Sequence, residues 1–168
     1  SVLGGISAHR IVEECSGEGW WPEIVGPGLG VDTEQYRVLG IDYIGGRGGS
    51  STPAGGDKFP PISAYDQAEA LYVIVRHLGL ESLHAIVGAS YGGMVALSFA
   101  ERHPEWVRHI VVLSAADKSQ ALSTAWRSVQ RQIGREAIAR GDGAAGLKLA
   151  RALAMATYRS PQEFTHRF

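Results

Sequence analysis

The sequence has little of what marks several large classes of protein. Its single cysteine, Cys15, excludes a disulfide within the chain. It has no apolar run long enough to cross a bilayer and no recognisable secretory signal. The 16 basic and 17 acidic residues almost cancel and form no long run of one sign, which argues against nucleic acid or an anionic membrane as a partner. We therefore expect small-molecule partners, no bound metal and a cytoplasmic location.

What is present is typical of a globular chain with one buried core, since 45% of the 168 residues are hydrophobic and 20% are charged. In the first two thirds, short apolar runs typical of buried strands alternate with stretches whose apolar residues have helical spacing. Strands are predicted at 1–3, 36–43, 83–88 and 109–113, and helices at 64–78 and 92–102. Because strands joined by helices pair in parallel, this order predicts an α/β fold with a mostly parallel sheet.

The pattern changes after Asp117, where two helical stretches follow one another without a strand between them. They cover about 121–140 and 144–158. The first has one apolar stripe, made by Trp126, Val129, Ile133 and Ala137. A helix with such a stripe needs a surface to pack on, so the pair has the character of a lid. We predict a core over residues 1–118 and a helical cap over 119–168.

Both ends of the sequence have the character of interior segments. The chain starts without a methionine, inside the predicted strand 1–3. At the other end, residues 160–163, Ser-Pro-Gln-Glu, are typical of a helix start: a serine cap, a proline in the first position, and a glutamate that completes a capping box. Phe168 follows soon after. We therefore expect the chain to be an incomplete fragment of a longer protein.

Residues 88–93, Gly-Ala-Ser-Tyr-Gly-Gly, match the pattern G-x-S-x-G, in which a serine sits on a sharp turn between a strand and a helix. Glycines are needed there because side chains at the flanking positions would collide with the strained backbone. An apolar strand leads into the turn and a helix of small residues leads out. This arrangement resembles the nucleophile elbow of the α/β-hydrolase fold and predicts Ser90 as the nucleophile. The alternative is that Ser90 only caps the following helix.

Two backbone amides are candidates for stabilising the oxyanion that forms when a serine attacks an acyl group. The first is the N–H of Tyr91, at a helix N-terminus whose dipole favours negative charge. The second should come from the loop after an earlier strand, here Gly4-Gly5-Ile6-Ser7, which points to the N–H of Ile6. The alternative for that loop is a plain glycine turn.

A serine nucleophile needs a histidine base and a carboxylate that orients it, in the chain order serine, acid, histidine. Of the histidines that follow Ser90, His103 sits at a helix end and His109 on the far side of the sheet from the elbow. A compact set of Ser90, Asp117 and His166 is one possibility, because it has the right chain order. We prefer an acid and a base that lie outside this fragment.

Two glycine-rich stretches, 26–30 and 45–51, invite comparison with phosphate-binding loops. Neither fits GxxxxGK[ST], and the first does not follow a strand. A nucleotide-binding loop is therefore not expected at either place.

The segments around Ser90 and along the rest of the chain resemble the homoserine O-acyltransferases, a branch of the α/β-hydrolase superfamily. The matching segments span nearly the whole sequence and are Gly19–Trp21, Val25–Gly28, Asp32–Thr33, Gly45–Pro53, Gly88–Met94, Ala156–Ser160 and Arg167–Phe168.

The resemblance implies a ping-pong reaction of methionine biosynthesis, in which Ser90 takes an acyl group from acyl-CoA and passes it to the hydroxyl of L-homoserine. Acyl-CoA is then a co-substrate, and no other cofactor is implied. The oxyanion donors fall on Ile6 and Tyr91, and the arginine and tyrosine that bind substrate fall on Arg151 and Tyr158. An arginine fork suits a carboxylate; the alternative is that both are ordinary helix residues. The resemblance also implies a possible homodimer.

The sequence departs from the family pattern in two places. Residues 4–8 read Gly-Gly-Ile-Ser-Ala, where acetyl-transferring relatives usually have His-Ala-Leu-Thr-Gly, and Tyr91 replaces a methionine or leucine. Both features are more similar to the succinyl-transferring members. Arg47 is a candidate to meet a CoA phosphate or a succinyl carboxylate. The competing hypotheses are a serine hydrolase or esterase of the same fold, acylation of L-serine, and a non-catalytic binding protein.

Overall fold

The computed structural model describes residues 1–13, 17–46, 48–51 and 59–167. The chain divides into two compact units, Ser1–Asp117 and Lys118–Phe168, which are treated separately below. Cys15 and Arg47 lie outside the described residues.

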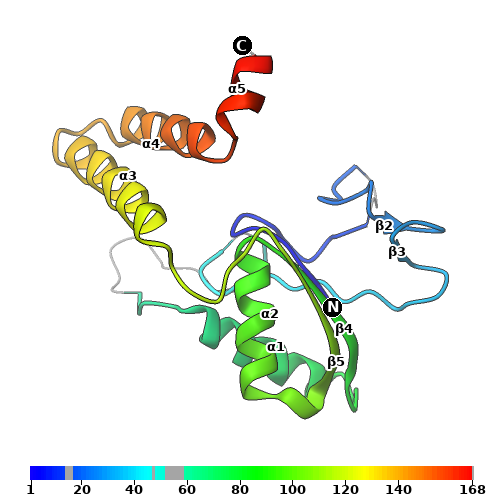
Figure 1. Ribbon diagram of the computed structural model, residues 1–168. Coiled ribbons are helices and arrows are strands. Elements are labelled where there is room, and N and C mark those ends of the chain that lie inside the picture. The colour runs from blue at the N-terminus through cyan, green and yellow to red at the C-terminus, as the bar shows by residue number, and fades with distance from the viewer. Residues whose placement is uncertain (14–16, 47, 52–58, 168) are drawn as a thin grey trace. The chain divides into compact units, whose positions relative to one another are not determined.

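A three-stranded parallel sheet forms the centre of the first unit (Figure 1). Its strands are β1 (Val2–Leu3), β4 (Leu83–Ala89) and β5 (Val107–Leu113), in the order β1-β4-β5. Gly88 of β4 is paired with Leu3 on one side and with Val112 on the other. The carboxyl ends of all three strands therefore lie at one edge of the sheet. The predicted α/β fold and parallel sheet are confirmed.

Two helices pack beside this sheet: α1 (Ala64–His77) and α2 (Tyr91–Arg102), the second followed by the short 3₁₀ helix η1 (Pro104–Trp106). Helix α2 lies against the strands and α1 lies beside α2 (Figure 1). Helix α1 starts at a capping box in which Ser63 and Asp66 satisfy each other's backbone amides. The apolar positions at helical spacing on α1 are buried, which is why this stretch folds as a helix against the core. The core comprises Leu3, Ile41, Tyr43, Ala68, Leu71, Val75, Leu83, Ile86, Val95, Ala96 and Phe99.

The predicted strand at 36–43 is wrong. The segment runs beside β1, where the amide of Val2 donates to the carbonyl of Leu39 at 3.0 Å, but it forms no regular ladder. Just after this segment, at Ile44, the backbone bonds to a side chain and not to a neighbouring strand. The amide and the carbonyl of Ile44 are both bonded to the side chain of Gln67, at 3.0 and 2.9 Å. The apolar run that suggested a strand is nevertheless partly buried, at Ile41 and Tyr43.

A smaller sheet pairs β2 (Val25–Gly26) with β3 (Val31–Asp32). Beside it lies a second apolar cluster of Val2, Val12 and Val25, with stacked rings of Trp20 and Trp21 packed nearby. The glycine-rich stretch 26–30 forms the turn between the two strands. The amide of Gly28 there donates to the carboxylate of Asp32 at 2.9 Å, so it is already occupied by an anion of the chain itself.

The second unit is helical and contains α3 (Ala121–Ala139), α4 (Gly143–Thr157) and α5 (Pro161–Arg167). Helices α3 and α4 pack closely, since a Cβ added to Gly146 would overlap that of Ala137. Helix α5 starts as predicted, with the hydroxyl of Ser160 accepting from the amide of Glu163 at 3.1 Å. Among the described residues, no helix combines the length and the apolar character needed to cross a membrane.

Candidate acyl-transfer site

The backbone turns sharply at Ser90, between β4 and α2. Ser90 has φ 55° and ψ −116°, in a region that residues with a Cβ rarely adopt. Such a conformation costs about 1–3 kcal/mol and persists only where the surrounding structure enforces it. Here the amide of Ser90 is held by the carbonyl of Leu113, at the end of β5, at 2.8 Å. The strained residue is therefore fixed at the carboxyl edge of the sheet.

Three glycines allow this turn to close. A Cβ on Gly88 would lie 2.8 Å from the Cα of Gly93, and a Cβ on Gly92 would lie 2.8 Å from the carbonyl oxygen of Gly4. A Cβ on Gly93 would lie 2.6 Å from that of Ala115. These separations are shorter than real side chains tolerate, so strand, turn and helix approach each other at a distance that glycine alone permits. This is the mechanical reason for the G-x-S-x-G spacing.

The side chain of Ser90 is exposed and makes no capping hydrogen bond to α2. The alternative reading, in which Ser90 serves only as a helix cap, is therefore wrong. The carbonyl of Ser90 accepts instead from the amides of Gly93 and Met94, at 3.0 and 3.3 Å. Because its side chain makes no capping bond, the hydroxyl of Ser90 is available at the amino end of α2, where the helix dipole favours negative charge.

The loop after β1 lies next to this turn. The amide of Gly92 donates to the carbonyl of Gly4 at 2.9 Å, which joins the loop to the first turn of α2. The loop itself is a tight turn closed by the amide of Ala8 and the carbonyl of Gly5 at 2.8 Å. Ile6 occupies a central position in that turn and its residue is 67% exposed. The bond between Gly92 and Gly4 thus joins the loop that carries Ile6 to the helix start that carries Tyr91.

Tyr43 contacts both the loop after β1 and the first residue of α2. It was not predicted from the sequence as part of the site. It is buried, its hydroxyl donates to the carbonyl of Gly4 at 2.9 Å, and its ring meets that of Tyr91 edge to face at 5.1 Å. Burial raises the pKa of Tyr43, with a smaller contribution from Tyr91. Burial also raises the pKa of Tyr91. Both phenols therefore stay protonated near neutral pH. A tyrosine at the end of an apolar run was the signal that could have revealed Tyr43.

Asp42 binds residues 49 and 50 of the second glycine-rich stretch. The carboxylate accepts from the amides of Gly49 and Arg10 at 2.9 and 2.8 Å, and forms an ion pair with the guanidinium of Arg10. The Asp42 side chain is 6% exposed. Burial by itself would raise the pKa of Asp42, but the bonds from Gly49 and Arg10 outweigh it and hold that pKa below its usual value. The stretch is thus organised by an internal carboxylate.

Replacing Asp42 by Asn should lower the free energy of unfolding by about 2 kcal/mol at pH 7, because the hydrogen bonds from Gly49 and Arg10 lose a charged acceptor. A carboxyl whose pKa is depressed by folding stabilises the protein above its unfolded pKa, about 3.9 for Asp, and loses that contribution as the pH falls through its folded pKa. The difference between wild type and variant should therefore shrink below about pH 4. Urea denaturation at several pH values measures it, with the exposed Glu23→Gln as control. A difference that does not depend on pH would contradict the assignment.

Both histidines that follow Ser90 in the first unit make ring contacts with neighbouring side chains. His103 stacks on Tyr72 with ring centres 3.9 Å apart and lies 3.1 Å from the carboxylate of Glu69. His109, in β5, meets His84 edge to face at 5.3 Å. Asp117 ends the first unit, and His166 lies on α5 in the second. The possible set of Ser90, Asp117 and His166 stays a prediction.

Arg151 and Tyr158 belong to the second unit. Arg151 is exposed on α4, and Tyr158 is its C-terminal cap residue and is 72% exposed. Seven residues correspond to about two helical turns, so both lie on one side of the helix, about 10 Å apart along its axis. Among the described residues, no three histidine, cysteine or acidic side chains gather as a metal site.

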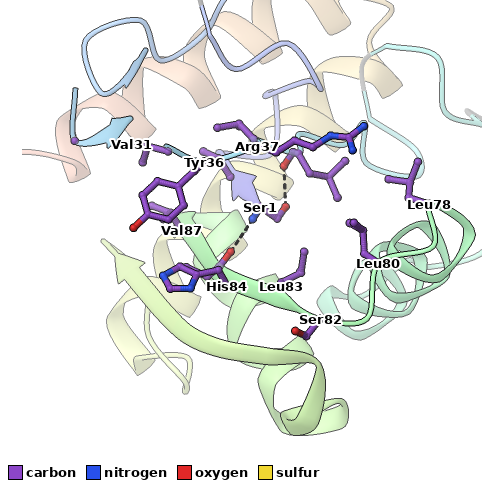
Figure 2. A pocket seen from close by; sticks show the side chains of 15 residues that line it. Ser1, Val31, Tyr36, Arg37, Leu78, Leu80, Ser82, Leu83, His84 and Val87 are labelled. Atoms are coloured by element: carbon purple, nitrogen blue, oxygen red, sulfur yellow. Dashed lines mark hydrogen bonds between the residues drawn. The ribbon is translucent and has the colours of Figure 1, made fainter. Parts of the chain in front are cut away.

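A cavity of about 520 Å³ lies elsewhere in the first unit (Figure 2). It is lined by the amino-terminal half of β4 and by the segment 36–39, with the ring of Tyr36 stacked on His84 at its wall. Ser90 follows the opposite end of β4 and does not line this cavity. A pocket for acyl transfer needs the nucleophile in its wall, so the turn at Ser90 is the better candidate site.

Residues 3–167 match the family described as the alpha/beta hydrolase fold. The chain belongs to this family. The strand, the turn at Ser90 and helix α2 have the arrangement that the nucleophile elbow has in this fold. The resemblance to homoserine O-acyltransferases is confirmed as well. The chain is 38% identical to a homoserine O-succinyltransferase of Xanthomonas campestris over 99% of its own length and 44% of that protein's.

Two further relatives of this α/β hydrolase agree with that relation. It is 40% identical to an L-serine/homoserine O-acetyltransferase of Streptomyces lavendulae, over 89% of the chain and 45% of the relative. The crystal structure of a homoserine O-acetyltransferase from Staphylococcus aureus superposes with a TM-score of 0.84 at 28% identity, over 99% of this chain and 50% of that one. The chain thus spans about half the length of the relatives it matches, in agreement with the predicted fragment.

Proposed function

We propose that this chain carries the nucleophile part of an acyltransferase that moves an acyl group from acyl-CoA to the hydroxyl of L-homoserine, a step of methionine biosynthesis in the cytoplasm. The observation that carries the proposal is an exposed, uncapped serine held at a strained turn, in a sequence 38% identical to a homoserine O-succinyltransferase. Small molecules are the substrates that fit the family. Acyl-CoA is consumed as a co-substrate, and no cofactor is required by the chemistry.

In the first half of the proposed reaction, the Ser90 hydroxyl oxygen attacks the thioester carbonyl and gives its proton to a general base. The carbonyl oxygen becomes an oxyanion, for which the amides of Tyr91 and Ile6 are the proposed donors. Tyr91 is the first residue of α2, where amides have no acceptor within the helix. When the tetrahedral intermediate collapses, the carbon–sulfur bond breaks, CoA leaves as the protonated thiol, and the acyl group stays on Ser90 as an ester.

In the second half, the hydroxyl of homoserine attacks this ester through the same oxyanion geometry. Its proton passes to the base, the bond from Ser90 to the acyl carbon breaks, and Ser90 recovers its proton. We propose that the histidine base and its carboxylate partner lie in the part of the relatives' length that this chain does not span. We also propose that residues 119–168 are the helical cap that the sequence predicts.

Arg151 and Tyr158 are the proposed ligands of the acceptor amino acid. The variants below are made in the full chain, by which we mean the protein that includes the proposed base and its carboxylate partner. Replacing Arg151 by Ala there should raise the KM for homoserine by about 10- to 100-fold, because a charged hydrogen-bond donor to the carboxylate is lost. Acylation of Ser90 should be unchanged, since homoserine enters after it. Initial rates against homoserine concentration and a single-turnover acylation assay separate the two. Arg140→Ala, which removes an arginine paired at the surface with Glu136, is the control. Slower acylation in the Arg151 variant would contradict this role.

The proposed function is tested by supplying the full chain with succinyl-CoA or acetyl-CoA, with L-homoserine, with L-serine, or with no acceptor. We expect steady-state release of CoA, after the first equivalent per enzyme, to depend on homoserine. It should be faster with the succinyl donor, since the sequence at 4–8 and Tyr91 favour that class. CoA released at the same rate without an acceptor would show a hydrolase instead. A preference for serine would keep the mechanism and change the acceptor.

A further inference from the structure

A carbonyl that accepts two hydrogen bonds connects the two proposed oxyanion donors. The carbonyl oxygen of Gly4 receives the amide of Gly92 and the hydroxyl of Tyr43, each at 2.9 Å. Gly4 lies two residues before Ile6, and Gly92 lies one residue after Tyr91. Any movement of the Gly4 carbonyl therefore changes the distance between the two amides that must point at one oxygen atom.

Tyr43 is itself held in place from the opposite side. Its neighbour Ile44 is clamped by Gln67, whose side-chain amide bonds both to the backbone N–H and to the backbone carbonyl of Ile44. Gln67 is buried on α1, a polar residue on the apolar face of that helix. The edge-to-face contact with Tyr91 fixes the plane of the Tyr43 ring. The hydroxyl thus has one position available and uses it to donate to Gly4.

We propose that Tyr43 is a positioning residue of the acyl-transfer site, whose hydroxyl holds the Gly4 carbonyl so that the amides of Ile6 and Tyr91 converge on the oxyanion. This inference rests on the proposed roles of Ile6, Ser90 and Tyr91. It adds a residue whose described contacts are with Gly4 and Tyr91. Burial raises the pKa of Tyr43, so the phenol keeps its proton near neutral pH and can donate to Gly4.

The test replaces Tyr43 by Phe in the full chain, which keeps the ring against Tyr91 and removes the donor to Gly4. p-Nitrophenyl acetate serves as the acylating agent because it loads a reactive serine whatever the natural donor and acceptor are. We expect the rate constant of the burst to fall by about 10- to 100-fold, since small displacements of oxyanion donors carry large penalties. The dissociation constant of the ester, obtained from the dependence of the burst rate on ester concentration, should stay within about twofold, because ground-state binding does not use the oxyanion donors.

Binding of an alkylboronic acid provides a readout that a merely structural role would not change. Its adduct with a serine hydroxyl is tetrahedral and anionic, and occupies the position of the oxyanion. The Tyr43→Phe variant should bind it more weakly by a factor similar to the loss in burst rate. Tyr65→Phe is the matched control, since it also removes one hydroxyl hydrogen bond, to Glu101, on the surface of the same unit. It should match wild type in both assays.

Incorporation of p-aminophenylalanine at position 43 should restore much of the burst rate, because it returns an N–H donor to the same place. If the phenylalanine variant does not fold, p-fluorophenylalanine at position 43 decides instead, because its fluorine fills the space of the hydroxyl and cannot donate to Gly4. Its burst should be slower by the same factor, and a wild-type burst rate in that variant would overturn the proposal. Equally, a folded Tyr43→Phe protein with unchanged burst rate and boronic acid affinity would overturn it. A wild-type chain that gives no burst would refute the nucleophile, and homoserine-independent turnover would refute the acceptor alone.

Discussion

Replacing Ser90 by Ala should abolish the burst of acylation in the full chain and lower turnover by about 10⁴-fold or more, as removal of an activated serine nucleophile generally does. The expectation follows from the exposed hydroxyl that forms no capping bond at the amino end of α2. The variant should fold, because the φ of Ser90 is enforced by its neighbours and alanine adds no volume. Stopped-flow release of CoA from succinyl-CoA, together with circular dichroism, measures both quantities.

Ser98→Ala is the control for this change. Ser98 lies on the same helix, is buried, and donates its hydroxyl to the carbonyl of Met94 one turn earlier, at 2.9 Å. Its replacement should leave the burst intact. If the Ser90 variant retained a full burst, another side chain would be the nucleophile and the assignment of the site would be wrong.

Replacing Gly92 by Ala should lower the free energy of unfolding even though alanine is the better helix former. The change gains about 1 kcal/mol of helix propensity. Against this, the new Cβ would lie 2.8 Å from the carbonyl oxygen of Gly4 and still closer to that of Leu3. Both are backbone atoms of the strand and loop beside the helix and cannot rotate away. Overpacking of this kind costs about 3 kcal/mol, so we expect a net loss of about 2 kcal/mol.

The matched control is Gly134→Ala, another glycine inside a helix. Within the described residues, no atom lies near the Cβ that would be added there, so this variant should gain about 1 kcal/mol. Thermal and urea unfolding of the two variants should therefore shift in opposite directions. Acylation should be slower in the Gly92 variant alone, because the bond from the Gly92 amide to Gly4 is displaced. A stabilised Gly92→Ala protein would contradict the close approach of α2 to β1.

Local patterns predicted most of the architecture. The apolar run before Gly88, the small residues after Gly92 and the helical spacing on α1 each specify one element by its own sequence, and the glycines around Ser90 specify the turn between them. The segment 36–43 was mispredicted because its apolar run matches that of a strand while the backbone beyond it bonds to the side chain of Gln67. Strand formation there depends on partners, which a single sequence does not specify.

The hydrogen bonds that the Gly4 carbonyl accepts from Gly92 and Tyr43 could not be predicted, for a related reason. Gly4, Tyr43, Gln67 and Gly92 are brought together by the fold and share no spacing in the chain. The amide of Ile6 was proposed from the position of its loop after the first strand and from the resemblance, and the turn at Gly5–Ala8 gives that proposal a local geometry. Arg151 and Tyr158 share a side of α4, as their spacing requires, but their role as ligands still rests on the resemblance.

The acyl group's place of attachment tests the central claim most directly. The full chain is mixed with succinyl-CoA in the absence of homoserine, quenched in acid, digested, and its peptides are weighed and fragmented in a mass spectrometer. The account predicts one succinylated peptide, with the modification on Ser90 and lost on adding homoserine. A modification on any other residue, or an unmodified Ser90 peptide while CoA is released, would contradict it.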